Sequence, residues 1–384
     1  MKVLVCPSGF KGSVSPDTAA DCIEAGVLRA MPATTIRKVP LADGGEGFAH
    51  ALVAATGGTI RKLHVVGPIG VPIHSFYGVL ANAPVKTAVI EMAAAAGLSL
   101  VPKDCRNPCI TTTFGVGQLM AAALDEGVEK VIIGCGDSGT SDGGAGMLQA
   151  LGARLVGRDG QNLPRARGGQ SLVSLAGVDF SKMHPRLKEV AIEAVCNWTN
   201  VLCGPQGVAR VYGPQKGASP EQTEVLEAAL QNYATVIYRT LGINVSDAAG
   251  SGASGGLGAG LLLIGAKLRP RYDALMEHFH LENIFNDCEL IITAEGAVDD
   301  QTPRGKIPSE VALRARGRGI PVIVLAGTVG QDARVNYEVG IGAFTSILQR
   351  PTTLEEAIEN TERLLTDAAE GAMRMVTIGQ RLAM

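Results

Sequence analysis

The sequence has almost no excess of charge of either sign. Its 384 residues include 34 Lys and Arg against 37 Asp and Glu, which gives a formal net charge of −3 at pH 7. Binding to the phosphate backbone of a nucleic acid requires a surplus of basic side chains. The composition therefore argues against a nucleic-acid partner.

Long apolar segments are also missing. Residues 1–10 contain too short an apolar run for a secretory signal peptide. Residues 248–266 carry no charge over 19 positions, but their first half consists of Gly, Ser and Ala, and only residues 257–264 are strongly apolar. A membrane-spanning helix is therefore not expected. These features predict a soluble, cytoplasmic protein that makes no membrane contact.

Several signatures of metal and nucleotide chemistry are absent. The 8 cysteines contain no Cys-x-x-Cys pair, and Cys6 and Cys135 end apolar runs that are typical of buried, reduced thiols. The 6 histidines show no metal-ligand spacing, and neither a P-loop nor a His-Glu-x-x-His motif occurs. A zinc site and a P-loop fold are not expected.

Glycine, in contrast, is abundant. The 49 glycines make up about 13% of the chain, against an average near 7%, and they occur in clusters. Three clusters open predicted helices: Asp43-Gly-Gly-Glu-Gly47, Asp142-Gly-Gly-Ala-Gly146 and the segment 250–256. Such a helix start presents free N–H groups and the positive end of the helix dipole to phosphate. The alternative for each cluster is a capped helix packed closely on its strand.

The hydrophobic pattern predicts an α/β protein. Apolar strands alternate with helical stretches along the chain. Strands are expected at residues 3–6, 36–41, 87–91, 130–135, 189–195, 290–293, 322–325 and 344–347. Neither end of the chain alone supplies enough βα units for a doubly wound sheet. We therefore predict a discontinuous Rossmann-like domain with a doubly wound parallel sheet, formed by residues 1–80 plus 285–384. Residues 81–284 would form an inserted second α/β domain, with the active site in the cleft between the two.

Two polar loops follow predicted strands of the discontinuous domain. Lys11 lies in the Gly-containing segment 7–13, and residues 295–306 carry several charged side chains between apolar flanks. Ligands of open α/β sheets bind beyond the carboxyl ends of the strands, so both loops are candidate parts of a site. Carboxylates suit Mg²⁺, and lysine suits the oxygens of a transferring phosphate.

A dinucleotide-binding interpretation competes with this one. Gly134-Cys-Gly-Asp-Ser-Gly139 matches Gly-x-Gly-x-x-Gly after a predicted strand. However, Asp137 would place a carboxylate near the pyrophosphate. The acidic residue expected about 20 positions later is Asp159, which lies in a turn rather than at the end of a second strand. The pattern therefore favours another use of this loop.

Several motifs together resemble those of the bacterial type I glycerate kinase family over nearly the whole chain. They are Phe10-Lys-Gly-Ser13, Ala42-Asp-Gly-Gly-Glu-Gly47, Thr113-Phe-Gly-Val-Gly117, Ser141-Asp-Gly-Gly-Ala-Gly-Met-Leu-Gln-Ala-Leu-Gly152, Gly213-Pro-Gln-Lys-Gly217, Gly255-Gly-Leu-Gly258, and Glu295-Gly with Gln301-Thr and Gly305-Lys306. The resemblance implies ATP-dependent phosphorylation of D-glycerate, with 2-phospho-D-glycerate as the expected product. It also implies two α/β domains and a magnesium requirement.

The motifs and the resemblance together give a list of candidate site residues. The candidates for catalysis are Lys11, Asp43, Asp142, Glu295 and Lys306. The candidates for ATP binding are Gly44, Gly45, Gly143, Gly144, Gly255, Gly256 and Lys216. The candidates for Mg²⁺ binding are Glu46, Asp137 and Asp299.

The sequence departs from the family pattern at three polar positions. Ser8 and Asn197 stand where the family has Asp, and Asp137 is an added carboxylate. We expect Asp137 to compensate as a metal ligand or as the base for the substrate hydroxyl, or else to cap the helix that opens near Asp142. The departures leave two alternatives open: a kinase of another small hydroxy acid, and a non-catalytic sensor of nucleotide or sugar acid. Assembly as a homodimer is likewise left open.

Overall fold

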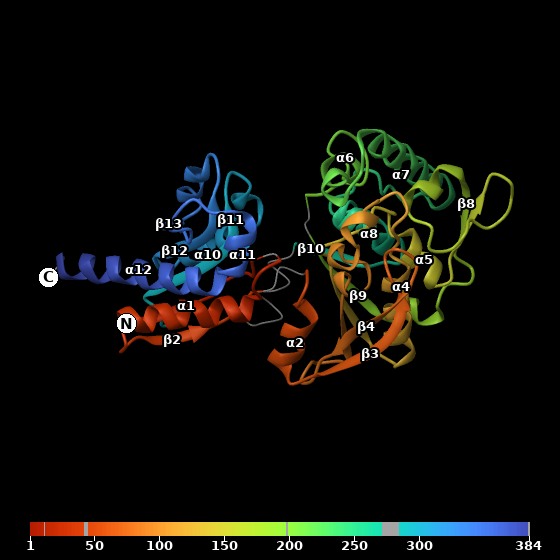
Figure 1. Ribbon diagram of the computed structural model, residues 1–384. Coiled ribbons are helices and arrows are strands. Elements are labelled where there is room, and N and C mark those ends of the chain that lie inside the picture. Colours follow the sequence, from red (N-terminus) through yellow and green to blue (C-terminus); the bar gives the residue numbers. More distant parts are fainter. Residues whose placement is uncertain (11, 42–44, 197–198, 271–283, 383–384) are drawn as a thin grey trace. The chain divides into compact units, whose positions relative to one another are not determined.

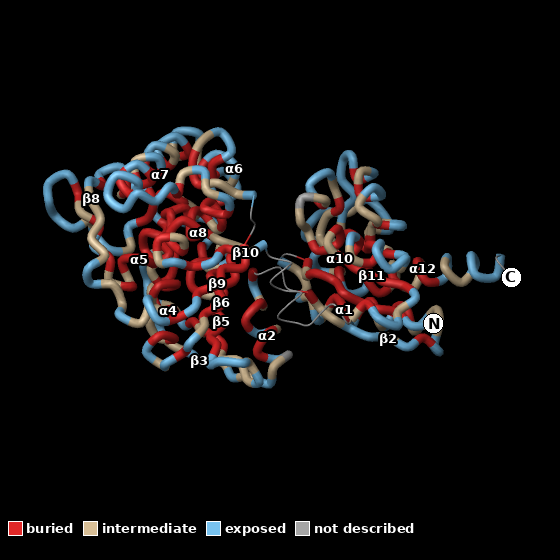
Figure 2. Tube along the Cα trace, turned by 180° about the vertical axis from the view of Figure 1, so that it is seen from behind, coloured by how far each residue is buried: buried red, intermediate tan, exposed pale blue. Residues whose placement is uncertain are grey.

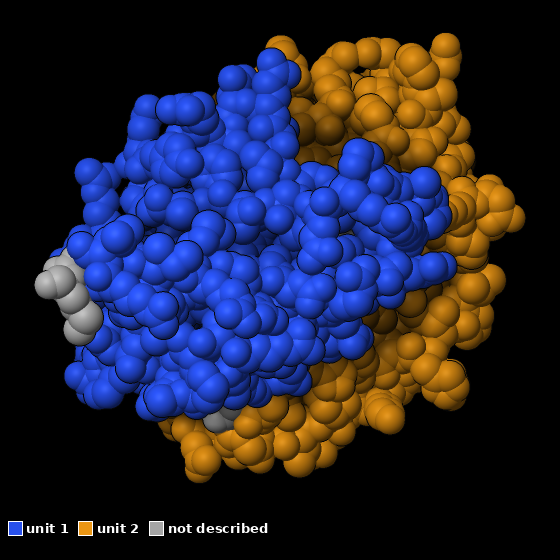
Figure 3. Space-filling model, turned by 60° about the vertical axis from the view of Figure 1, so that its left-hand side comes forward, with its two compact units in different colours: residues 1–43, 276–384 blue, residues 44–275 orange. Residues whose placement is uncertain are grey.

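The chain folds into two compact units, each with its own sheet. The computed structural model in Figure 1 describes residues 1–10, 12–41, 45–196, 199–270 and 284–382. Unit 1 comprises residues 1–43 and 276–384, and unit 2 comprises residues 44–275 (Figure 3). The two ends of the chain share unit 1, and the first boundary between the units lies at residue 43, whereas the sequence pattern places it at residue 80.

Unit 1 contains a five-stranded sheet in which all pairs of neighbouring strands are parallel. The strands are β1 (Lys2–Val5), β2 (Thr35–Lys38), β11 (Leu290–Val298), β12 (Val322–Val329) and β13 (Ala343–Ser346), in the order β13-β12-β11-β1-β2. The strands of a parallel sheet are usually covered on both faces, which explains why β1 and the first part of β11 consist mainly of apolar residues.

The helices of unit 1 are α1 (Pro16–Ala30), α10 (Ile307–Arg316), α11 (Leu354–Glu359) and α12 (Thr361–Leu382). Asn360 separates α11 from α12. α1 and α12 pack along one another (Figure 1). Gly26 of α1 allows this close approach, because a Cβ at that position would lie 2.2 Å from the carbonyl oxygen of Thr366.

The strand order of unit 1 creates a switch point between β1 and β11. From β1 the chain passes outward to β2, and from β11 it passes in the opposite direction to β12 and β13. Open α/β sheets bind ligands beyond the carboxyl ends of the strands at such a point. The segment after β1 follows the neighbouring strand there, since the N–H of Ser8 donates to the carbonyl of Ala294 at 2.9 Å.

Unit 2 is built on a six-stranded mixed sheet. Its strands are β3 (Thr59–Val66), β4 (Pro72–Val79), β5 (Thr87–Glu91), β6 (Lys130–Gly134), β9 (Ala191–Cys196) and β10 (Lys267–Pro270), in the order β10-β9-β6-β5-β4-β3. The hairpin of β3 and β4 pairs with β5 in antiparallel orientation. Residues 59–79 therefore extend this second sheet, which is why the boundary predicted at residue 80 is corrected to residue 43.

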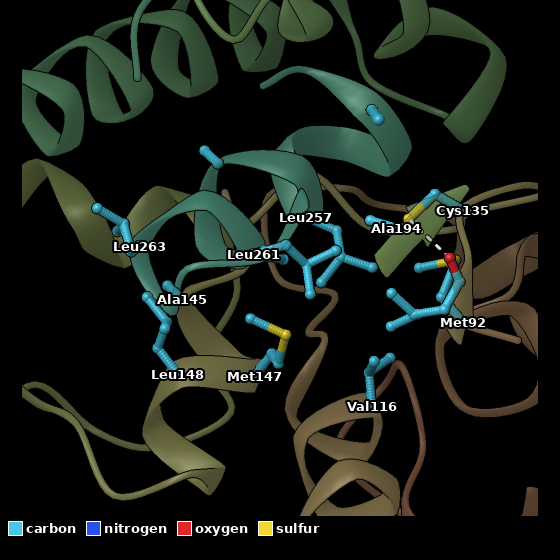
Figure 4. Close-up of a cluster of buried hydrophobic side chains, with 14 of the residues drawn as sticks. Met92, Val116, Cys135, Ala145, Met147, Leu148, Ala194, Leu257, Leu261 and Leu263 are labelled. Carbon is cyan, nitrogen blue, oxygen red and sulfur yellow. Dashed lines mark hydrogen bonds between the residues drawn. The ribbon is translucent and has the colours of Figure 1, made fainter. Parts of the chain in front are cut away.

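The remaining elements of unit 2 surround this sheet. They are α2 (Phe48–Thr56), α3 (Ala93–Ala96), α4 (Phe114–Asp125), α5 (Ala145–Ala150), α6 (Val208–Tyr212), α7 (Pro220–Leu241), α8 (Ala253–Leu263) and the two-stranded sheet of β7 (Arg154–Gly157) and β8 (Leu175–Asp179). The central strands β5, β6 and β9 and the inner helix faces are largely buried (Figure 2). Figure 4 shows part of this core, where Leu257 and Leu261 of α8 share a cluster with Met147 of α5.

In the part of the chain that the structure describes, none of the helices combines the length and the apolar character needed to cross a bilayer.

Candidate functional site

Three carboxylates of unit 2 lie near one another at the carboxyl ends of β5 and β6. Glu91 is the last residue of β5, and its register partner Gly134 is the last residue of β6. Asp137 follows β6 by three residues, and Glu46 precedes α2. One carboxylate oxygen of Asp137 accepts the backbone N–H of Glu46 at 3.2 Å. The negative charges of Glu46 and Asp137 both raise the pKa of Glu91. The structure therefore brings two predicted metal ligands together and adds a third acidic group.

Asp137 does not cap the helix that opens near Asp142, so that alternative is wrong. Its carboxylate bonds to the loop before α2 instead. The backbone N–H groups of Gly144 and Gly146 at the start of α5 donate to Asp142, at 3.1 and 3.2 Å. Asp137 has a left-handed backbone, with φ at 51°, a conformation that Asp and Asn tolerate better than most residues.

The position of Asp137 leads to a testable expectation. Asn accepts the same N–H group and tolerates the same backbone, but it carries no charge and accepts no proton. If Asp137 serves the metal or the substrate hydroxyl, Asp137→Asn lowers kcat roughly tenfold or more without changing the melting temperature. Steady-state kinetics and thermal unfolding measure the two effects. Full activity in the variant would show that Asp137 has neither role.

Glu91 is the member of this group that the sequence analysis did not single out. It retains 4% of its surface exposure. One of its oxygens accepts the N–H of Ala49 at 2.9 Å. Burial raises the pKa of Glu91 to about 7, against the opposing effect of the backbone N–H groups of Ala49 and Gly47, which favour the charged form. An acidic residue that ends an apolar strand of a parallel sheet is the sequence signal that could have revealed it.

The raised pKa of Glu91 makes stability depend on pH. The ordinary value of 4.5 applies to the unfolded chain, and the folded value is about 7. The protonated Glu91 therefore makes its full contribution to the free energy of unfolding below pH 4.5. This contribution is lost as the pH rises through 7. Relative to Glu91→Gln, which does not titrate, the free energy of unfolding of the natural chain should fall by up to about 3 kcal/mol between pH 4.5 and pH 8. Urea unfolding of both proteins across this range tests the sign, and parallel pH profiles would contradict it.

Asp142 lies in the interior of unit 2 with 1% of its surface exposed. Besides the start of α5, its carboxylate binds Thr113 before α4, with the backbone N–H at 2.8 Å and the hydroxyl at 2.9 Å. Burial raises the pKa of this carboxyl, and the hydrogen bonds oppose the effect. The arrangement lets Asp142 hold the starts of two helices together, while its predicted catalytic role stays a prediction.

The four predicted glycines of the second and third clusters lie where the starts of α5 and α8 pack closely together. The N–H of Gly143 donates to the carbonyl of Gly255 at 3.1 Å, and a Cβ on Gly256 would lie 2.7 Å from the Cα of Gly143. A Cβ on Gly144 would lie 2.9 Å from the Cα of Gly260. All four are buried. This close packing explains the need for glycine here without a ligand, so the assignment of these glycines to ATP binding stays a prediction.

Lys216 lies beside the same glycine contact and is 3% exposed. Its Nζ donates to the hydroxyl of Ser138 at 2.9 Å and to the carbonyl of Thr140 at 2.6 Å. A Cβ on Gly255 would lie 3.0 Å from this nitrogen. Lys216 therefore brings a positive charge to the loop that follows β6.

The second group of predicted residues lies in unit 1. Glu295 is within β11, and Asp299 directly follows that strand. Lys306 precedes α10, and its Nζ lies 3.2 Å from a carboxylate oxygen of Asp299 and 3.5 Å from the carbonyl of Ala297. This loop lies at the carboxyl end of β11. The neighbouring strand is β1, and the segment that contains Ser8 follows it. Both segments therefore lie at the switch point of the sheet.

Asp299 is already engaged in organising its own loop. The same oxygen that contacts Lys306 also accepts the N–H of Gln301 at 3.0 Å and contacts the hydroxyl of Thr302 at 3.3 Å. This carboxylate orients the lysine and the turn toward α10. Its role as a metal ligand stays a prediction.

Some predicted residues lie outside the described part of the chain. They are Lys11, Asp43, Gly44 and the departing position Asn197. Gly45 is described and buried directly before Glu46. Among the residues that the structure describes, no three His, Cys, Asp or Glu side chains are arranged to hold a metal ion.

Comparison with known proteins gives the same family over the whole length. The statistical model described as "Glycerate kinase family" matches residues 3–377. The chain therefore belongs to the glycerate kinase family. A curated glycerate kinase of Bacillus subtilis strain 168 is 42% identical over 383 residues, covering 100% of this chain and 99% of the relative. A glycerate 2-kinase of Escherichia coli K12 is 41% identical, with 100% of each chain covered.

A solved structure of this family supports the fold. A crystal structure described as a glycerate kinase 2 of Salmonella typhimurium LT2 matches with a TM-score of 0.78 and 42% identity, and the match covers 100% of both chains. The mixed α/β architecture with parallel strands is thus that of a glycerate kinase structural relative. The resemblance that the motifs predict is confirmed at the level of the family.

Proposed function

We propose that this chain transfers the γ-phosphoryl group of ATP to D-glycerate and forms 2-phospho-D-glycerate. The observation that carries the proposal is full-length identity of about 40% to curated glycerate kinases. The name of the Escherichia coli relative, glycerate 2-kinase, supports the 2-phosphate as the product. The strand order of unit 1 supports a doubly wound, Rossmann-like domain with its ligand site at the switch point.

Phosphoryl transfer requires little covalent chemistry from a protein. The substrate hydroxyl must be aligned with the γ-phosphoryl group, and the charge on the phosphate oxygens must be neutralised. Lys306 carries a positive charge at the switch point, held by Asp299 at 3.2 Å. Lys11, at the end of the segment after β1, is the second proposed cation. We assign the contact with transferring phosphate to Lys306 and the acceptance of the hydroxyl proton to a carboxylate such as Glu295.

ATP and Mg²⁺ are the proposed cofactors. Mg²⁺ usually binds through one or two carboxylates together with water and substrate phosphates, rather than in an all-protein cage. The acidic group of Glu46 and Asp137 fits this limited donor set, although it does not form a complete cage. When bound, Mg²⁺ would neutralise charge on the phosphates. Lys216 and the neighbouring glycine-rich segments are the proposed sites for the phosphates of ATP.

An ADP-release assay tests the proposed function. The purified chain is incubated with ATP and Mg²⁺, and D-glycerate or another small hydroxy acid is added. We expect ADP only with D-glycerate, at one equivalent per acid consumed. Turnover of a different hydroxy acid with no turnover of D-glycerate would support the alternative kinase. ATP binding with no ADP release for any acid would support the sensor.

A further inference from the structure

We propose that Glu91 is a positioning residue that fixes the segment 45–49 and thereby the carboxylate of Glu46. The inference rests on the proposed function, because Glu46 matters for catalysis only if the chain transfers phosphate. It concerns a residue outside every motif that predicts the site.

The first observation is the way in which α2 begins. The residue before its first turn is Gly47, with a left-handed backbone (φ 88°) and no side chain that could cap the helix. The free N–H groups of a helix start need acceptors when they are buried. Glu91, at the end of β5 and 42 residues beyond Ala49 in the chain, accepts the N–H of Ala49 at 2.9 Å, and the N–H of Gly47 also favours its charged form. A strand residue thus supplies the cap that the helix itself lacks.

The second observation is the cost of keeping a carboxylate at this position. Burying an acidic group without a cation is unfavourable unless hydrogen bonds satisfy it. The groups that favour the charged form of Glu91 are two backbone N–H groups, whereas Glu46 and Asp137 disfavour it. A neutral apolar residue would fill the end of β5 without this cost. The buried carboxylate of Glu91 is therefore better explained by its positioning of the segment 45–49 than by a gain in stability.

The third observation is that both the backbone and the carboxylate of Glu46 have hydrogen-bond partners next to the Glu91 contact. Its backbone N–H donates to Asp137 after β6. Its carboxylate accepts the hydroxyl of Ser99, and Glu91 holds the next residues of the chain. Loss of the Glu91 contact would remove one of three side-chain hydrogen bonds that hold residues 46–49, the others being those of Asp137 and Ser99. A small displacement of a positioned group can lower a rate by orders of magnitude.

The experiment compares Glu91→Ala and Glu91→Gln with a matched control. Glu193 is also buried and lies on β9 of the same sheet, but it is paired with Lys130 at 2.9 Å and Arg269 at 3.0 Å. Glu193→Ala therefore removes a buried glutamate whose ion-pair partners lie on β6 and β10 rather than on α2. We expect Glu91→Ala to lower kcat about tenfold, with a smaller change in KM, and Glu91→Gln to retain most of the activity because it keeps one acceptor oxygen.

A double-mutant cycle with Glu46→Gln separates positioning from general destabilisation. If Glu91 acts through Glu46, the fold-decrease in kcat of the double variant should be at least about threefold smaller than the product of the two single fold-decreases. In the control double variant, which combines Glu193→Ala with Glu46→Gln, the fold-decrease in kcat should equal the product of the two single fold-decreases. Independent losses for Glu91 and Glu46 would overturn the proposal. If Glu91→Ala does not fold, Glu91→Asp replaces it, since its side chain is one methylene shorter and withdraws the carboxylate from the N–H of Ala49.

A measurement that needs no activity distinguishes this proposal from the proposed function. Hydrogen–deuterium exchange of the peptide spanning residues 45–55 should speed up in Glu91→Ala and remain at the natural rate in Glu193→Ala. Unchanged exchange would overturn the positioning role even in an active enzyme. Faster exchange in a chain that does not phosphorylate D-glycerate would instead contradict only the proposed function.

Discussion

Replacing Lys306 by alanine should lower kcat by about 100-fold or more. The Nζ of Lys306 is held near the carboxyl end of β11 by Asp299 and by the carbonyl of Ala297. Negative charge on a transferring phosphoryl group would be stabilised there by a cation that needs no reorganisation during the reaction. Steady-state kinetics with ATP and D-glycerate measure the loss, and circular dichroism verifies that the fold is intact.

Lys38→Ala provides the control for this variant. Lys38 belongs to β2 of the same sheet and forms ion pairs with Asp21 at 2.7 Å and Glu24 at 2.5 Å. Its loss removes a partly exposed lysine and its ion pairs without touching the switch point. Activity within about twofold of the natural chain is expected. Equally small effects of both substitutions would mean that Lys306 is an ordinary surface lysine.

Among the substitutions considered, Asp142→Ala should produce the largest loss of stability, about 3–5 kcal/mol in the free energy of unfolding. The substitution leaves the N–H groups of Thr113, Gly144 and Gly146 without the acceptor that they have now. Buried donors that lose their acceptor destabilise a fold far more than exposed ones. Urea unfolding of the two proteins at the same pH measures the difference.

Two further variants serve as controls for Asp142→Ala. Asp125→Ala at the exposed end of α4 removes a carboxylate that contacts His184 at 3.1 Å, and its effect on stability should stay within about 0.5 kcal/mol. Asp142→Asn keeps the shape of the side chain. If this variant unfolds at the natural temperature but has lost turnover, Asp142 is catalytic rather than a link between two helix starts.

The sequence predicts the strands of unit 1 well because parallel strands are uniformly apolar. β1, β11 and β12 start within one residue of the predicted positions. The loops that follow β1 and β11 could be predicted as parts of a site, because ligands of α/β sheets bind at the carboxyl ends of the strands. The hairpin of β3 and β4 escaped prediction, and with it the boundary at residue 43. Its pairing with β5 is a tertiary contact that the local pattern does not specify.

The candidate site is less accessible to sequence reasoning. A glycine-rich helix start looks the same whether it faces a phosphate or another backbone, so the contact between Gly143 and Gly255 could not be foreseen. Likewise, Asp137 and Asp142 both precede α5, and only the structure shows that Asp142 bonds to its first turn. Glu91 was missed because its partner, the N–H of Ala49, is 42 residues away in the sequence.

An enolase-coupled assay is the most direct test of the central claim, which is that this chain phosphorylates D-glycerate at the 2-hydroxyl. The chain is incubated with ATP, Mg²⁺ and D-glycerate, and enolase is added without phosphoglycerate mutase. Enolase consumes only the 2-phosphate, so phosphoenolpyruvate should form at once and in proportion to the ADP released. ADP release with no phosphoenolpyruvate until mutase is added would contradict the 2-phosphate product, and the absence of both would contradict the kinase itself.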